Sequence, residues 1–218
     1  MTTEDGVTER RAILKAMILA LCAGFIADRP AKAEEASPGP VAPIRRLDAA
    51  LLAAMKAGPG TPFVQRFAAL RPVIERTFDL DTILAITVGM RWTTLPSQQK
   101  QRLAAAFRRY TVATYTANFD HYDGQRFQLQ PATRPVGNGD VIVYSKFIGS
   151  DGSAVALDYV MRDGARGWQA VDVLAEGGIS RVATQRSEFN AVLSSGGAPA
   201  LTAALEQKVA SLSGGAIA

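Results

Sequence analysis

The sequence predicts an α+β fold, in which one antiparallel sheet of about four strands is wrapped by helices. Three observations predict it. Apolar residues recur at helical spacing between residues 44 and 119, the apolar period changes to two between residues 126 and 175, and helical spacing then returns. Helices before and after one meander of strands are typical of a single sheet covered on its apolar side.

The first half of this domain contains four expected helices. The first two have apolar stripes, formed by Ile44, Leu47, Leu51 and Met55 and then by Phe63, Phe67, Leu70 and Ile74. Gly58 closes the first helix, and Pro72 is expected to bend or end the second. Asp79 can cap a short third helix. A fourth helix, from Pro96 to about Phe119, is apolar nearly all round in its second half, which predicts burial.

The strands are expected at residues 126–130, 141–148, 155–161 and 168–175. Turn sequences NGD, SDGS and RDGARG precede the last three runs and favour hairpins. One side-chain phase is apolar and contains Val141, Val143, Leu157, Tyr159, Met161, Val171 and Val173. The opposite phase contains Lys146, Asp158 and Asp172. We therefore expect one face of the sheet to contact apolar side chains and the other to be partly polar.

Two helices are expected after the sheet. Ile179, Val182, Phe189 and Leu193 form the stripe of the first. Gly196 and Gly197 end it, and Pro199 begins the second.

The N-terminal residues 1–33 read as an export signal. Arg10 and Arg11 precede a mostly apolar run, and Ala31-Lys32-Ala33 fits a small-x-small cleavage site. The segment RRAILK resembles a twin-arginine signal, and an ordinary Sec signal is the alternative. An uncleaved anchor is disfavoured, because the uncharged run of residues 16–27 is shorter than the roughly 20 residues that span a bilayer. Residues 34–42 read as a linker and residues 43–218 as one domain, which we expect in the periplasm.

Composition excludes several function classes. The only cysteine, Cys22, lies within the signal, so the mature chain has no thiol for disulfides, metal ligation or catalysis. The formal net charge of +4 falls to +3 without residues 1–33, and no block of Lys or Arg suggests nucleic-acid binding. The single histidine, His121, follows a helix end, where a structural or surface role is favoured over catalysis. We expect no metal and no cofactor.

Other candidate sites have simpler interpretations. Gly177-Gly178 lacks the phosphate-loop spacings and favours a tight strand-to-helix turn. Asp158 and Asp172 could act as paired carboxylates, but their phase favours exposure or ion pairing with Arg162, Lys146 or Arg166. Aromatic and aliphatic residues at regular spacing are more often core than cavity lining, and periodicity cannot separate the two.

Three sets of residues occur in order along the chain: FDLDTILAITVGMRW (78–92), then Gln98, Phe107 and Tyr115, and LDYVMRDGARGWQAVDVLAEGGISRVATQRSEF (157–189). This ordered set resembles the MlaC family of periplasmic lipid-binding proteins. Together they extend the resemblance over residues 43–212. The segment EGGIS departs from the family's usual EGVSL and is closer to HpnM, the branch associated with hopanoids.

The resemblance implies a strongly curved NTF2-like sheet and an apolar pocket between the sheet and the helices. It implies a carrier that moves a hopanoid or a phospholipid between inner and outer membranes. The implied partners are an inner-membrane transporter complex, an outer-membrane lipoprotein complex and, transiently, the membrane surface. From phase we expect these lining residues: Val88, Trp92, Phe107, Tyr110, Val141, Val143, Leu157, Tyr159, Met161, Val171 and Val173.

Two competing hypotheses remain. NTF2-like folds also host enzymes that act on lipids or steroid-like substrates, which would need an acid or base in the pocket. Tyr159 and His121 are the least implausible candidates for that role. The other hypothesis is an adaptor whose cavity is filled by its own side chains.

Overall fold

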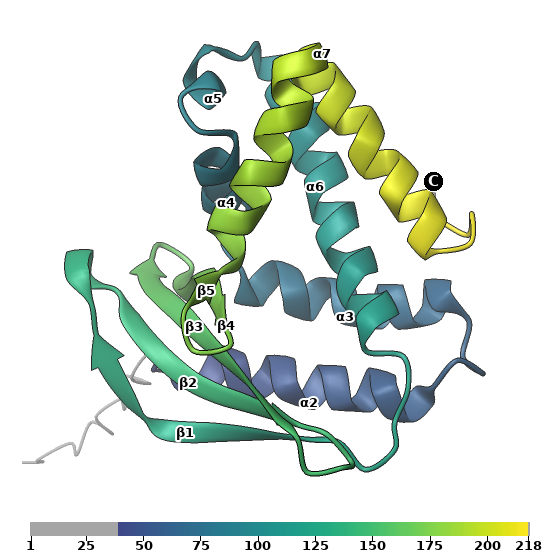
Figure 1. Cartoon of the computed structure of the whole chain (residues 1–218), viewed down its shortest axis with the longest axis vertical. Coiled ribbons are helices and arrows are strands. Elements are labelled where there is room, and N and C mark those ends of the chain that lie inside the picture. The colour runs from purple at the N-terminus through teal and green to yellow at the C-terminus, as the bar shows by residue number, and fades with distance from the viewer. Residues whose placement is uncertain (1–38, 218) are drawn as a thin grey trace, which may run out of the picture. The chain divides into compact units, whose positions relative to one another are not determined.

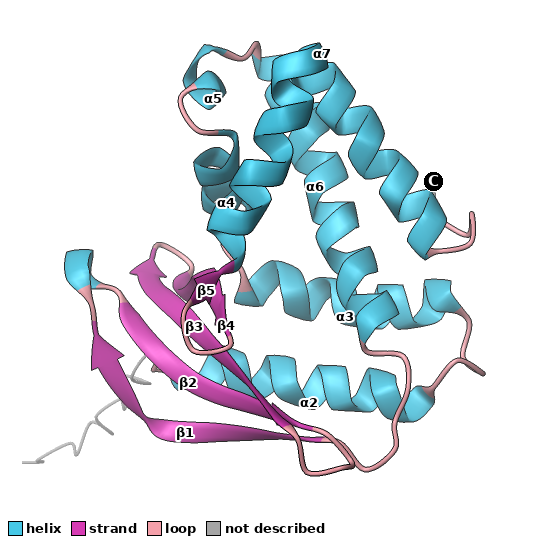
Figure 2. Ribbon diagram, in the orientation of Figure 1, coloured by secondary structure: helices cyan, strands magenta, loops and turns pink. Residues whose placement is uncertain are grey.

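The computed structural model describes residues 39–217 (Figures 1 and 2). Its helices are α2 (Val41–Ala57), α3 (Phe63–Thr77), α4 (Leu80–Val88), α5 (Arg91–Thr94), α6 (Ser97–Asn118) and α7 (Arg181–Leu212). Its strands are β1 (Arg126–Pro135), β2 (Val141–Ile148), β3 (Ala154–Gly164), β4 (Gly167–Ala175) and β5 (Ile179–Ser180), with a short 3-10 turn, η1 (Gly137–Gly139). The predicted signal, 1–33, lies outside the described residues, and α2 begins within the predicted linker, 34–42.

The strands form one open antiparallel sheet in the order β1-β2-β3-β4-β5 (Figure 2). The α+β prediction is confirmed, with five strands rather than about four because a two-residue strand follows β4. Bulges interrupt the register between Leu129 and Thr133 and between Val160 and Met161. Since a bulge bends its strand and increases the local twist, these irregularities favour the curvature of the sheet.

The second bulge corrects one part of the predicted side-chain phase. Val160 pairs with Asp172, whereas the next residue, Met161, pairs with Ala170. Val171 is therefore the extra residue on β4. Ala170, and not Val171, lies opposite Met161, because one inserted residue shifts the alternation of side chains by one position.

Most predicted helices are confirmed. Asp79 caps α4: its Oδ1 accepts a hydrogen bond of 3.2 Å from the backbone N–H of Thr82. Pro72 does not end α3, which continues to Thr77. A proline removes only one backbone donor. The helix continues for five residues beyond Pro72, and Ile74 and Thr77 in this last part are buried.

The last helix, α7, is broken at the predicted glycines. Gly197 has φ +66° and ψ −163°, a conformation open almost only to glycine, and Figure 1 shows the two arms of α7 meeting at this bend. Ile179 is not part of the helical stripe that was predicted. It lies in β5 and is 53% exposed, since the turn after β4 makes a hairpin before the helix begins.

One core joins the helices to the inner face of the sheet. Its members include Leu47 of α2, Leu84 of α4, Leu103 of α6, Val143 of β2 and Leu205 of α7. No helix among residues 39–217 has an apolar stretch long enough to cross a membrane.

Candidate functional site

A cavity of about 460 Å³ lies between strands β3 and β4 and helices α4, α6 and α7. This volume is within the range of roughly 300–1,000 Å³ that is usual for sites that bind small organic molecules. The lining residues are Phe78, Leu80, Ile83, Phe107, Tyr110, Thr111, Thr114, Tyr115, Asn118, Phe119, Leu157, Tyr159, Asp172, Val173, Ala175, Arg181, Val182 and Gln185. Most are aliphatic or aromatic, so the cavity suits an apolar ligand.

Aromatic rings form a connected wall of this cavity. The rings of Phe78 and Tyr115 have centroids 5.6 Å apart, and Phe78 and Tyr159 are 6.4 Å apart. Tyr115 stacks on Phe119 at 5.9 Å with planes only 12° apart. Each such ring contact adds about 0.5–1.5 kcal/mol to the packing of this wall.

Two of the polar lining residues lie where the cavity meets solvent. Arg181, the first residue of α7, and Asn118, the last of α6, are both exposed. A guanidinium group at the mouth of an apolar cavity can attract a negatively charged group of a ligand. The arrangement therefore suits a molecule with an apolar body and an anionic end.

The turn before α7 places Arg181 at this opening. Glu176 and Gly177 both have positive φ, 52° and 80°, and the N–H of Gly178 bonds to the carbonyl of Ala175 at 3.1 Å. This is the geometry of a tight hairpin turn. The glycine pair makes a turn as predicted, but the turn joins β4 to β5 rather than a strand to a helix.

Burial changes the acid–base behaviour of the two cavity tyrosines. Loss of solvent raises the pKa of Tyr115 and of Tyr159 well above their usual value. Both phenols therefore stay protonated at neutral pH. They can donate a hydrogen bond to a ligand, but they cannot serve as general bases there.

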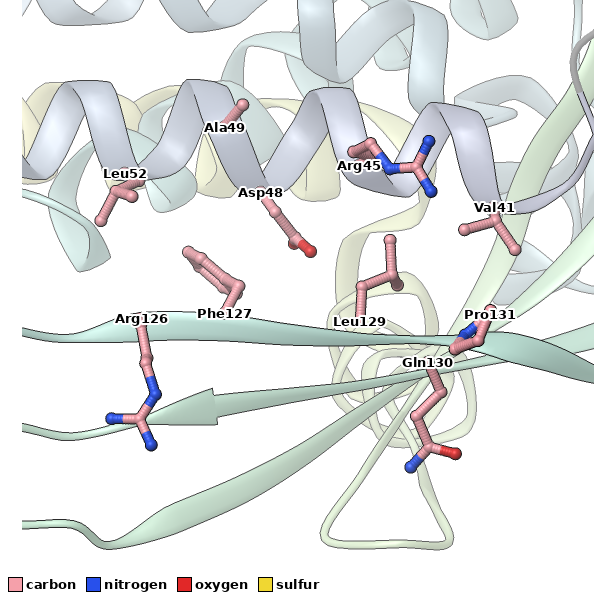
Figure 3. Close-up of a pocket in the computed structure, with 10 residues that line it drawn as sticks. All are labelled: Val41, Arg45, Asp48, Ala49, Leu52, Arg126, Phe127, Leu129, Gln130 and Pro131. Carbon is pink, nitrogen blue, oxygen red and sulfur yellow. The ribbon is translucent and has the colours of Figure 1, made fainter.

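A second depression, of about 300 Å³, lies between α2 and β1 and is open to solvent, with Arg45, Arg126 and Gln130 exposed along it (Figure 3). Val41, Leu52, Phe127 and Leu129 contribute apolar surface to it, with Arg45 at its edge. Asp48 points from α2 toward Phe127 and Leu129 (Figure 3). Sequence reasoning missed Asp48, although an aspartate inside the apolar stripe of α2 was a visible signal.

The structure brings five of the eleven predicted residues together around the main cavity. They are Phe107, Tyr110, Leu157, Tyr159 and Val173. Val88, Val143, Met161 and Val171 are buried, and Trp92 and Val141 are half-buried, but none of these six lines that cavity. Pattern reasoning also missed Phe78, Leu80 and Ile83, whose apolar character alone could not separate lining from core.

Other features of the described residues do not form comparable sites. His121 is exposed and does not line the cavity. Residues 39–217 contain no cluster of three or more His, Cys, Asp or Glu that could hold a metal ion. A broader depression of about 830 Å³ is lined largely by charged or polar groups, including Arg46, Glu75 and Arg166, and does not suit an apolar ligand.

Comparison with known proteins identifies the family. The phospholipid-binding protein from Ralstonia solanacearum, solved in complex with a phospholipid, has a similar fold, with a TM-score of 0.69 and 24% sequence identity. The match covers 80% of this chain and 99% of that chain. Residues 45–207 match the MlaC protein family, and the chain therefore belongs to that family.

Proposed function

We propose that this protein is a periplasmic lipid carrier, which shields the apolar part of a lipid while it crosses the aqueous space between two membranes. The observation that supports this function best is the apolar cavity with exposed Arg181 at its opening. Exposed lipid chains cost about 0.8 kcal/mol per CH₂ group in water, and a closed cavity removes much of that cost. Residues 43–218 would form the lipid-binding domain, exported by the signal at residues 1–33.

The ligand would be a phospholipid or a hopanoid. The aromatic and aliphatic walls suit either acyl chains or a fused-ring body. The phospholipid bound to the related protein from Ralstonia solanacearum supports the first, and the EGGIS segment at residues 176–180 supports the second.

Delivery would require partners at both membranes. An affinity high enough to solubilise a lipid also retains it, so release needs a contact that opens the cavity or competes for the ligand. An inner-membrane transporter complex and an outer-membrane lipoprotein complex would make these contacts, together with brief docking at the membrane surface.

Carriage without catalysis accounts for the cavity better than enzymatic turnover does. The enzyme hypothesis named Tyr159 and His121 as acid or base. Tyr159 lines the cavity, but burial raises the pKa of its phenol, which therefore stays protonated and could act only as a proton donor, not as a base; His121 lies outside the lining. An enzyme would also convert the lipid, which makes the two hypotheses distinguishable.

The direct test is to express the full chain with its signal in a Gram-negative host and purify the exported protein. Native mass spectrometry and solvent extraction should find one lipid per protein molecule, chemically unchanged. The purified protein should also move a radiolabelled phospholipid from donor to acceptor vesicles. Protein without lipid, together with no transfer between vesicles, would reject the carrier, and a converted lipid would establish the enzyme.

A further inference from the structure

Met90 is the most exposed of the large apolar side chains in residues 39–217, with 90% of its surface in solvent. It follows Gly89, which ends α4, and precedes the short helix α5. Ile86, in the last turn of α4, is also exposed, at 41%. Scattered apolar residues are normal on a protein surface, but a methionine this exposed makes almost no contact with its own chain. Its presence at this position is therefore not explained by packing.

Hydrogen bonds hold Met90 in a projecting turn. Gly89 has φ +69°, a conformation that favours glycine, and its carbonyl accepts a bond of 2.9 Å from the N–H of Trp92. The hydroxyl of Thr93 donates a bond of 2.9 Å to the carbonyl of Met90. Figure 1 shows α5 and the loops around it at one end of the molecule, beside the bend of α7 and away from strands β1 and β2. A hydrogen-bonded turn thus displays Met90 to the solvent.

Arg91, the next residue, carries a positive charge that no acid neutralises. Its Nη1 donates to Oδ1 of Asn190 at 3.0 Å, and its Nη2 donates to Oγ of Ser194 at 3.2 Å. Both acceptors are neutral, and no ion pair involves Arg91 among the described residues. The guanidinium is therefore anchored to α7, and its charge stays available to an anionic partner.

Lys100 provides a second cation beside the same turn. Its Nζ donates to the carbonyl of Thr93 at 3.3 Å and lies 5.8 Å from the centre of the half-buried Trp92 ring. Within residues 39–217 Lys100 likewise forms no ion pair. Its ammonium group therefore adds to the charge of Arg91 at this end of the molecule.

The acids of α4 and of the first arm of α7 do not cancel these charges. Asp81, on α4, is paired with Arg108 at 2.6 Å. Glu188, on α7, lies two residues before Asn190 and so on nearly the opposite side of that helix. Apolar and cationic side chains therefore gather at one tip, which we call the α4–α5 tip and which consists of Ile86, Met90, Arg91, Trp92 and Lys100.

The same elements join this tip to the lipid cavity. The first arm of α7 begins with Arg181 at the cavity opening and reaches Asn190, which is bonded to Arg91. These nine residues span roughly 14 Å along the helix. Leu80 and Ile83 of α4 also line the cavity. A surface that binds the tip therefore lies close to the opening.

We propose, on the basis of the carrier function above, that the α4–α5 tip docks on a membrane surface that contains anionic phospholipids. Met90 enters the boundary between headgroups and acyl chains, while Arg91 and Lys100 contact lipid phosphates. Docking at the tip brings the opening of the cavity to the membrane, where a lipid enters or leaves.

The chemistry of the tip fits a lipid surface better than a protein partner. A specific interface between two proteins buries about 800 Å² on each partner, and a projecting turn with one fully exposed methionine offers little of the flat area that this requires. Interfacial anchors of membrane-bound proteins instead combine apolar side chains, which enter the lipid, with Lys and Arg, which stay at the headgroups. The two unpaired cations of the tip complement the negative charge of such headgroups.

The test measures how the purified exported protein sediments with sucrose-loaded vesicles. The wild type should bind vesicles of phosphatidylglycerol and phosphatidylethanolamine more tightly than vesicles of phosphatidylcholine. We expect Met90→Ser to weaken binding to the anionic vesicles about tenfold, because a buried apolar side chain is lost. Lys100→Gln should weaken it about fivefold, the effect of one cation near an anionic surface. Both side chains are at the surface, so the midpoint of thermal unfolding should not change.

Val64→Ser is the matched control, since Val64 is an apolar residue of α3 outside the tip and is 44% exposed. It should change vesicle binding less than about twofold. Equal binding by the wild type and Met90→Ser would overturn the docking tip, as would binding only to vesicles that carry membrane proteins. Native mass spectrometry of the same samples keeps the two proposals apart: bound lipid would leave the carrier standing in either case. Absence of both bound lipid and vesicle binding would overturn both.

Discussion

The hydroxyl of Ser180 donates a 2.5 Å hydrogen bond to Oδ2 of Asp172, and the same hydroxyl oxygen accepts a 2.9 Å bond from the backbone N–H of Ala183. Oδ1 of Asp172 accepts from the N–H of Val182 at 3.1 Å. Two residues from different elements thus satisfy the first N–H groups of α7. The pair fixes where the helix starts, and with it the position of Arg181 at the cavity opening.

Replacing Ser180 with alanine should lower the free energy of unfolding by about 1–2 kcal/mol, because the cap of α7 is lost. Denaturant unfolding measures the change. Ser187→Ala, at an exposed position later in the same helix, is the matched control and should stay within about 0.5 kcal/mol of the wild type. Equal effects of the two substitutions would contradict the capping role.

Two residues of the same predicted face should respond differently to a negative charge. Leu157→Glu places the charge in the cavity wall and should prevent lipid uptake while the protein still folds. Val143 is fully buried and does not line the cavity, so Val143→Glu should destabilise the fold by several kcal/mol, about 3 or more. Thermal unfolding by circular dichroism and uptake from phospholipid vesicles measure the two effects. Equal loss of folding in both variants would mean that Leu157 is core.

Removing the charge at the cavity opening should weaken uptake of anionic lipids. Arg181→Ala should reduce uptake from phosphatidylglycerol vesicles about fivefold, corresponding to roughly 1 kcal/mol for one cation near an anionic surface. Arg186→Ala removes an exposed charge from the same helix but not from the cavity lining, and serves as the control. Added salt should reduce the difference in lipid uptake between the wild type and Arg181→Ala. A loss of uptake in Arg181→Ala that does not depend on salt would argue against an electrostatic role.

The buried carboxyl of Asp48 predicts a pH-dependent stability. Its pKa rises from an ordinary value of 3.8 to about 7 in the folded chain because of burial. Between these values the folded state binds more protons at Asp48 than the unfolded state, so the contribution of this group to stability is greatest below about pH 4 and falls as pH rises toward 7. The contribution is on the order of 4 kcal/mol.

Asp48→Asn removes this ionisation and isolates its effect. As pH rises from 4 to 8, the free energy of unfolding of the wild type should fall relative to that of Asp48→Asn. Above pH 8 the difference between the two proteins should stay constant. Urea unfolding at a series of pH values measures it. A difference that is constant with pH would show that Asp48 ionises in the folded protein as freely as in the unfolded chain.

The bend in α7 should tolerate no side chain at Gly197. Its φ of +66° with ψ of −163° is strained for any residue with a Cβ atom, so Gly197→Ala should cost about 1–3 kcal/mol of stability. Ser195→Ala, two residues earlier and exposed, is the control. A Gly197→Ala variant as stable as the wild type would imply that another backbone conformation at residue 197 can connect the two arms of α7.

Local sequence signals predicted the elements well, because periodicity and turn chemistry act within a few residues. The hairpins after NGD, SDGS and RDGARG, the Asp79 cap and the break at Gly197 all follow from such signals. The errors arose where a long-range effect overrode a local one. Because of the bulge on β4, Val171 does not share the face of the other residues of its predicted phase. Ile179 pairs with β4 and therefore lies in a strand rather than in a helix.

The sequence by itself determined the order of helices and strands, the apolar face of the sheet and membership of the MlaC family, since these depend on residue types and spacing along the chain. Only the tertiary structure decided which apolar residues surround empty space. Val143 and Leu157 share a face, yet one packs against core side chains and the other borders the cavity, because different groups lie across from them. The surroundings of Asp48 likewise depend on the tertiary structure: only the folded chain shows that Oδ1 of this carboxyl has no hydrogen-bond partner among residues 39–217.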